Sequence, residues 1–250
     1  MKYYHDLYND KFYNEIVFNK KNGFFVEIGV LDGIRHSQSY FFEKYLNWDG
    51  IIVEPHPIWH DRIIENRHCK FATTPISDEN KTEVFICREE PAFSSLKKDT
   101  LHFQNSPILA EYKMESLTLT QLLKNHNAPK IIDFISVDVE GSELIILNKF
   151  LKDGEYLANL ISFEHYDYNL AKNLMENTDY MELKNPFIDF IKLSKRGLVK
   201  LNSTDGLFYY DNNEICNEDY SDLRDIEFEH YYIHIDYLKN NRNLKKYIKK

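Results

Sequence analysis

Two acidic residues stand two positions apart after a buried apolar stretch in the middle of this chain. The stretch Ile131–Val137 predicts a central strand, and it is followed by Asp138, Val139, Glu140 and Gly141. Alternate residues of an extended strand point to the same side, so the two carboxyl groups should leave the strand end together. Negative charge concentrated there is costly unless it serves a cation, a catalytic base or a metal ion. Asp138 and Glu140 are therefore candidate catalytic residues.

A glycine turn near the start of the chain has the spacing of a ligand-binding turn. Phe24–Ile28 predicts a buried strand, Gly29 and Gly33 bracket a tight turn, and a helical pattern follows. Glycine lets the backbone turn sharply and approach a ligand. The dinucleotide fingerprint G-x-G-x-x-G is not met, because Leu31 stands where its middle glycine would be. Glu27 suits an ammonium group better than a pyrophosphate, which favours S-adenosylmethionine (SAM) as the cofactor.

Polar residues follow the next two predicted strands as well. Ile51–Val53 ends at Glu54, about one strand–helix–strand step after the glycine turn, where an acid can hold both hydroxyls of a ribose. Ser77 and Asp78 follow a third, weaker strand. Asp78 is placed to accept a hydrogen bond from an adenine amino group, but the same residues are also typical of a solvated turn.

A further strand, Leu160–Phe163, ends at Glu164 and His165. Such a pair is more often a hydrogen-bonded structural feature than a metal site. If this strand lies beside the strand that ends at Asp138, a shared metal site becomes the better interpretation.

Strands that alternate with helical segments predict an α/β fold, in which a mostly parallel, Rossmann-like sheet carries helices on both faces. Segments 198–202 and 206–210 flank a short turn and predict a C-terminal antiparallel hairpin that closes the sheet. Residues 88–113 lack a clear period and predict a long loop over the active face. We expect three parts, namely an N-terminal helical extension at 1–20, the main domain at 21–210 and C-terminal decoration at 211–250.

The composition limits the class of partner. A net charge of -9 argues against a nucleic-acid partner, which would need basic phosphate contacts. No signal peptide or membrane-spanning stretch is recognisable, so the cytoplasm is the expected location. The 3 cysteines are dispersed, which argues against a disulfide framework and a thiolate zinc site. Whether the chain forms a homo-oligomer stays open.

Four segments together resemble the FkbM family of SAM-dependent O-methyltransferases. They are residues 25–33, 52–55, 76–78 and 134–143, and the similarity extends over about residues 20 to 210. The resemblance implies a class I methyltransferase fold, SAM as cofactor, and a hydroxyl of a sugar or polyketide-type molecule as acceptor. Many family members act in cell-surface glycan or natural-product pathways. We therefore expect a sugar or nucleotide-sugar substrate, as in polysaccharide biosynthesis.

The resemblance also assigns roles to residues. Asp138, Glu164 and His165 look like the metal set of metal-dependent sugar O-methyltransferases, with Mg²⁺ as the expected ion, although Glu-His replaces two consecutive aspartates of that group. A divalent metal would lower the pKa of the acceptor hydroxyl and orient it. Asp138, Glu140 and His165 are the expected catalytic residues, with His165 or Glu140 as the base. The expected cofactor-binding residues are Glu27, Gly29, Gly33, Ser37, Glu54, Ser77 and Asp78.

Three other functions compete with this hypothesis. One is a methyltransferase that acts on a non-sugar small molecule, and another is a non-catalytic binding protein that keeps the SAM fold. A nicotinamide-dependent oxidoreductase would share the glycine turn and Glu54. The missing glycine, Glu27 and the predicted hairpin argue against it.

Overall fold

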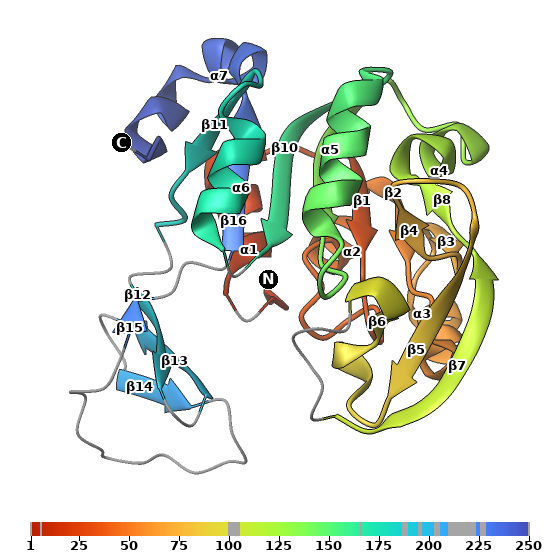
Figure 1. Cartoon of the computed structure of the whole chain (residues 1–250). Helices are drawn as coiled ribbons and strands as arrows, with labels where there is room; N and C mark the ends of the chain where they lie inside the picture. The colour runs from red at the N-terminus through yellow and green to blue at the C-terminus, as the bar shows by residue number, and fades with distance from the viewer. Residues whose placement is uncertain are drawn as a thin grey trace.

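A seven-stranded sheet forms the centre of the protein in the computed structural model (Figure 1). The structure describes residues 2–5, 7–99, 106–165, 167–186, 190–194, 197–202, 206–209, 224–225 and 229–249. The strand order is β11-β16-β10-β9-β1-β2-β3. The strands are β1 (Phe24–Ile28), β2 (Asp49–Val53), β3 (Lys70–Ala72), β9 (Ile131–Val137), β10 (Leu157–Glu164), β11 (Tyr180–Leu183) and β16 (Glu229–His234). Only β16 among them runs antiparallel to its neighbours, β10 and β11.

The central strands are apolar on both faces because helices cover both. Phe25 of β1 pairs with Phe134 of β9, and Val26 pairs with Ile135, so the two pairs point to opposite faces. All four side chains are fully buried. Nearly continuous apolar runs are typical of parallel strands packed on both sides.

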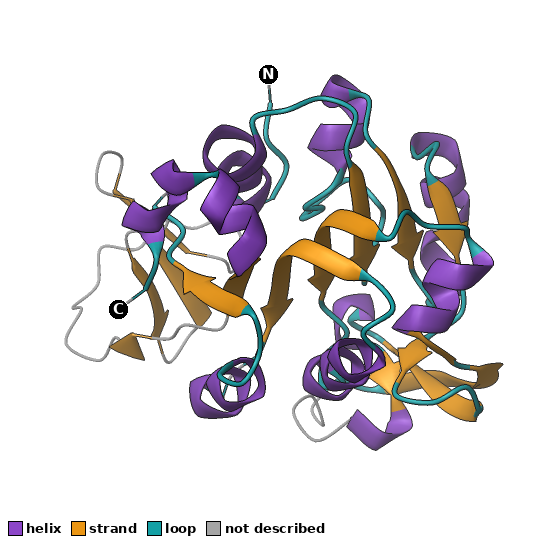
Figure 2. Ribbon diagram, turned by 90° about the horizontal axis from the view of Figure 1, so that it is seen from above, coloured by secondary structure: helices purple, strands orange, loops and turns teal. Residues whose placement is uncertain are grey.

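Two groups of helices cover the two faces (Figure 2). One face packs against α4 (Leu119–Asn125), α5 (Glu143–Asp153) and α6 (Tyr168–Met175). The other packs against α1 (Asn9–Phe12), the π-helical η1 (Tyr13–Phe18), α2 (Tyr40–Leu46), α3 (His60–Asn66), α7 (Ile235–Asn240) and the 3-10 helix η6 (Arg242–Tyr247). The short 3-10 helix η2 (Pro57–Trp59) leads from β2 into α3. The predicted α/β fold class is thereby confirmed, and no helix among the described residues is long and apolar enough to cross a membrane.

The predicted C-terminal hairpin forms, but outside the central sheet. β13 (Gly197–Asn202) and β14 (Gly206–Tyr209) pair antiparallel within a separate four-stranded sheet that also contains β12 (Phe190–Ser194) and β15 (Arg224–Asp225). The antiparallel strand of the central sheet is β16, from the segment that the sequence suggested as decoration. A domain boundary at residue 210 would therefore separate β16 from the sheet in which it is paired on both sides.

The chain between β3 and β9 builds a small structure beside the main sheet. β4 (Ile76–Ser77) pairs with β8 (Leu117–Thr118), and β5 (Thr82–Arg88) lies between β6 (Ser95–Leu96) and β7 (Ile108–Glu115). The 3-10 helices η3 (Pro91–Phe93) and η4 (Lys97–Asp99) flank β6. The prediction of a long loop at 88–113 was therefore wrong in part, because the segment also forms β6 and most of β7. Its largely exposed strand β7 has too little apolar alternation to be recognised from sequence.

Candidate active site

The backbone segments that follow β1 and β9 approach each other closely at the carboxyl ends of these strands. Gly29 has a φ of +83°, and a Cβ atom at this position would overlap the carbonyl oxygen of Asp138. The Asp138 N–H donates to the Ile28 carbonyl at 2.9 Å, which holds the two strand ends together. Only glycine combines this φ with this close approach. Ligands bind at such points of open α/β sheets, where the strand order reverses.

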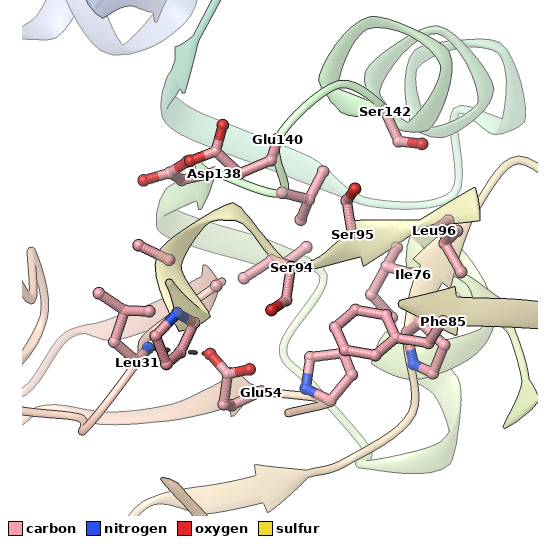
Figure 3. A pocket seen from close by; sticks show the side chains of 17 residues that line it. Leu31, Glu54, Ile76, Phe85, Ser94, Ser95, Leu96, Asp138, Glu140 and Ser142 are labelled. Atoms are coloured by element: carbon pink, nitrogen blue, oxygen red, sulfur yellow. Dashed lines mark hydrogen bonds between the residues drawn. The ribbon is translucent and has the colours of Figure 1, made fainter. Parts of the chain in front are cut away.

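A pocket opens at this point (Figure 3). Its cavity volume is about 90 Å³, within about 660 Å³ of empty space that includes open solvent. Acidic side chains from β2 and β9 lie on one part of its wall, and apolar side chains from the β4–β6 region lie on another. The lining includes Gly29, Glu54, Pro55, Pro75, Ile76, Phe85, Ser94, Ser95, Leu96, Asp138 and Glu140.

Glu54 is buried at the wall of this pocket, with 4% of its surface exposed. One carboxylate oxygen accepts a hydrogen bond from Leu31 N–H at 2.9 Å, and the other accepts one from His56 N–H at 2.8 Å. Burial raises the pKa of Glu54 to about 7, although these backbone donors act in the opposite direction. Each carboxylate oxygen can accept a second hydrogen bond. The group is therefore able to bind ligand hydroxyls, most strongly when it is ionised.

Asp138 and Glu140 bring two carboxyl groups side by side at the pocket (Figure 3). Glu140 adopts a left-handed backbone conformation with a φ of +62°. The Glu143 carboxylate supports this turn by accepting hydrogen bonds from Val139 N–H and Gly141 N–H. Burial, the largest cause, and the neighbouring Asp138 together raise the pKa of Glu140 to about 9. Burial and then the charges of other acids raise the pKa of Asp138 well above its usual value. At neutral pH Glu140 therefore retains a proton that an isolated carboxyl group would lose.

Glu164 lies near Asp138 because β9 and β10 are neighbouring parallel strands. It is the acid that raises the pKa of Asp138 most after burial, and Glu229 is the next. Glu229 pairs directly with Glu164 across the antiparallel strands β10 and β16. The pKa of Glu229 is itself raised to about 7 by burial. Sequence analysis missed Glu229, since only the strand register places it opposite Glu164.

The predicted metal set is not assembled. The Nδ1 atom of His165 accepts a hydrogen bond from Asp167 N–H at 3.0 Å, so its ring is held by its own loop. Within the part of the chain that the structure describes, no three His, Cys, Asp or Glu side chains are arranged to hold a metal ion. Asp138, Glu164 and His165 therefore do not form a metal site among the described residues.

Glu27 and Ser37 bind each other rather than the pocket. The buried Glu27 carboxylate accepts hydrogen bonds from Ser37 Oγ at 2.9 Å, from Gln38 N–H at 2.7 Å, and from the N–H and hydroxyl of Ser39. Neither Glu27 nor Ser37 lines the pocket, and the same is true of Gly33. These residues shape the segment between the glycine turn and α2, and their contact with the cofactor stays a prediction.

Ser77 and Asp78 also lie outside the pocket lining. Ser77 Oγ donates to Asp78 at 3.0 Å, and Lys98 Nζ donates to Ser77 Oγ at 2.7 Å. Burial opposes ionisation of Asp78, but the hydrogen bonds from Ser77 and Lys98 outweigh it and lower the pKa of Asp78. Of the seven predicted cofactor residues, the pocket thus contains Gly29 and Glu54. Sequence analysis missed Ser94 and Ser95, whose only signal was their position in the predicted loop over the active face.

Comparison with known proteins gives one match at the level of families. The family model described as the methyltransferase FkbM domain matches residues 27–193, more than half of the chain. No curated protein matches the chain.

Three solved structures are similar at low identity. One is a precorrin-6y C5,15-methyltransferase from Geobacter metallireducens GS-15, with a TM-score of 0.44 and 9% identity over 90% of this chain and 86% of that one. Another is a putative methyltransferase from Thermoplasma acidophilum, with a TM-score of 0.36 and 11% identity over 86% of this chain and 69% of that one. The third is a human methyltransferase 10 domain containing protein, with a TM-score of 0.34 and 11% identity over 76% of this chain and 75% of that one. The fold follows from the strand order of the central sheet.

Proposed function

We propose that this chain transfers a methyl group from SAM to a hydroxyl oxygen of a sugar. The chain belongs to the FkbM methyltransferase family. The sugar would be part of a nucleotide sugar or a surface-glycan precursor. Family membership accounts for methyl transfer and SAM, and the seven-stranded sheet has the class I methyltransferase fold. The observation that carries the choice of a hydroxyl acceptor is the carboxyl pair of Asp138 and Glu140 at the pocket.

The residues at the pocket suit SAM. When bound, SAM supplies a methyl group on a positively charged sulfur. Glu54 is placed to accept hydrogen bonds from the ribose hydroxyls, and Gly29 lines the same pocket. The raised pKa values of Asp138 and Glu140 favour a cationic ligand nearby, because a positive charge stabilises their ionised forms.

A hydroxyl acceptor needs a base because it is a poor nucleophile while it carries its proton. The Asp138–Glu140 pair supplies one when one of its carboxyl groups is ionised beside the cationic ligand, and that carboxylate accepts the hydroxyl proton as the oxygen attacks. A carboxylate with a raised pKa takes up a proton more readily than an ordinary one, which makes this pair the stronger base. Methyl transfer is otherwise a matter of positioning in a site that excludes water.

The charge of the pocket favours a neutral, hydroxyl-rich acceptor group. Its described lining contains three acids and several serines but neither Lys nor Arg. Sugar hydroxyls donate hydrogen bonds to carboxylates, whereas a phosphate would be repelled. We therefore expect the sugar ring to enter the site, and the phosphates of any carrier to stay outside the described pocket.

The test is transfer of isotope-labelled methyl from SAM to a panel of nucleotide sugars, free sugars and non-sugar hydroxyl compounds. We expect an O-methyl sugar, identified by NMR, and loss of at least 100-fold in turnover for Asp138→Asn or Glu140→Gln with binding of S-adenosylhomocysteine (SAH) retained. Asp133→Asn is the matched control, since Asp133 is a buried carboxylate at the opposite end of β9. Transfer only to nitrogen, carbon or a non-sugar hydroxyl would contradict the proposal. Parallel assays with Mg²⁺ and with a chelator test the metal requirement predicted from the sequence.

A further inference from the structure

Ser95 has a buried hydroxyl without a partner in the pocket wall. The residue is 2% exposed, and its Oγ atom has no hydrogen-bond partner among the described residues. The neighbouring Ser94 differs, because its Oγ accepts a hydrogen bond from Arg88 N–H at 3.0 Å. A buried hydroxyl that makes no hydrogen bond destabilises the fold. Such a group is explained if a ligand supplies the missing hydrogen bond.

The surroundings of Ser95 have the character of a site for a flat aromatic ring. Ile76, Phe85 and Leu96 gather on one side of the pocket, with Ser95 next to them (Figure 3). Pro55 and Pro75 complete this apolar wall. A heteroaromatic base buries its two faces against apolar side chains and satisfies its polar edge with hydrogen bonds. The apolar side chains and the single unpartnered hydroxyl match these two requirements.

The position of Glu54 sets the direction in which the ligand runs. Glu54 and Ser95 lie well apart within the same pocket (Figure 3). A nucleoside whose ribose is held by Glu54 places its base away from that residue, and the amino group of adenine lies on the edge remote from the ribose. The edge that reaches Ser95 is therefore the amino-bearing one.

We infer that Ser95 recognises the adenine of SAM, with its hydroxyl hydrogen-bonded to the amino-bearing edge of the base. The inference rests on the proposed use of SAM and is independent of the acceptor. It replaces the role that the sequence suggested for Asp78, whose carboxylate is engaged by Ser77 and Lys98 outside the pocket lining. Base recognition would thus come from β6, within the segment inserted between β4 and β8.

The test compares wild type and Ser95→Ala by calorimetry with SAH and with S-ribosylhomocysteine, in which a hydroxyl replaces the adenine base. We expect SAH to bind about five- to tenfold more weakly to Ser95→Ala, the loss typical of one hydrogen bond. The affinity for S-ribosylhomocysteine should change less than about twofold, since this ligand has no base for Ser95 to contact. Asp78→Asn should leave SAH affinity within about twofold of wild type, because its carboxylate lies outside the pocket lining.

Thermal unfolding of the ligand-free proteins separates recognition from a structural role. Ser95→Ala should unfold at a temperature no lower than wild type, because it removes a hydroxyl that has no partner to lose. The matched control is Ser116→Ala. Ser116 is equally buried, lies outside the pocket lining, and its Oγ donates to the carbonyls of Glu79 and Lys81 at 2.9 Å. This control should unfold at a lower temperature and bind SAH as wild type does.

Each other result has a definite meaning. Unchanged SAH affinity in Ser95→Ala, or an equal loss of affinity for both ligands, overturns the inference and leaves the methyltransferase proposal intact. Failure of the wild-type protein to bind SAH at all would overturn the use of SAM as well.

Discussion

Replacing Glu54 by glutamine should abolish the pH dependence of nucleoside binding. The Glu54 carboxyl is buried at the pocket wall and has a pKa raised to about 7 by that burial. If its ionised form accepts the hydrogen bonds of the ribose hydroxyls, affinity must follow the ionised fraction. Glutamine has a similar shape but does not titrate, so the variant isolates the charge.

The magnitude follows from the ionised fraction. With a pKa of about 7, roughly a tenth of the Glu54 side chains are ionised at pH 6 and roughly nine-tenths at pH 8. The affinity of wild type should therefore rise about tenfold between these pH values. The suitable probe is 5′-methylthioadenosine, which has the ribose and the base but neither ammonium nor sulfonium. Its neutrality keeps Asp138 and Glu140 from responding to the charge of the ligand.

The assay is calorimetric titration of the full chain at pH 6, 7 and 8. Glu54→Gln should bind the probe equally at all three values, and at least about tenfold more weakly than wild type at pH 8, because hydrogen bonds to a charged acceptor are lost. Asp133→Asn, the distant buried carboxylate, should keep the wild-type dependence. A wild-type affinity that does not change with pH, or a Glu54→Gln variant that keeps the tenfold rise, would refute the assignment of Glu54 to the ribose.

Three further predictions concern the fold around the site. Gly29→Ala should lower the free energy of unfolding in urea by about 3 kcal/mol or more and abolish SAH binding, because the new Cβ overlaps the Asp138 carbonyl at a φ of +83°; wild-type stability would contradict the close approach. Arg67→Met should cost about 3 to 5 kcal/mol in the same assay, since it leaves Glu43 without the buried cation that now lies 2.6 Å away; the double variant with Glu43→Gln should recover part of this loss. Thermal stability should fall as pH rises from 5 to 8, because buried acids with raised pKa values stay protonated in the folded state and ionise on unfolding. Each acid contributes about 1.4 kcal/mol per pH unit until the pH reaches its pKa in the folded state; a melting temperature that rises over this range would contradict the prediction. The acids concerned are Glu54, Glu140 and Glu229.

Local patterns in the sequence were enough for the fold class and for part of the site. The apolar strands β1, β2 and β9, the glycine turn and the acids Glu54 and Asp138 are contiguous signals, because a buried parallel strand must be apolar along its length. The residue that ends such a strand is delivered to the same edge of the sheet as the ends of its neighbours. That rule predicts that Glu54, Asp138 and Glu140 come together, and all three line one pocket.

The direction of individual side chains required the tertiary structure. Glu27 has the position expected of a cofactor ligand, yet its carboxylate is occupied by the N–H and hydroxyl groups of Ser37–Ser39. Asp78 is likewise held by Ser77 and Lys98. A carboxylate takes whichever donors the folded chain presents to it, and sequence spacing alone does not identify them.

The α/β fold with a mostly parallel sheet and the acids at the ends of its central strands could be predicted from short-range periodicity, and the class I methyltransferase fold from the family resemblance. The long-range pairings required the folded structure: β16 lies between β10 and β11, Glu229 faces Glu164, and β6 brings Ser95 to the pocket that Glu54 and Asp138 also line. Their physical origin is the register of strands that are far apart along the chain, which depends on the packing of the whole core rather than on any local pattern.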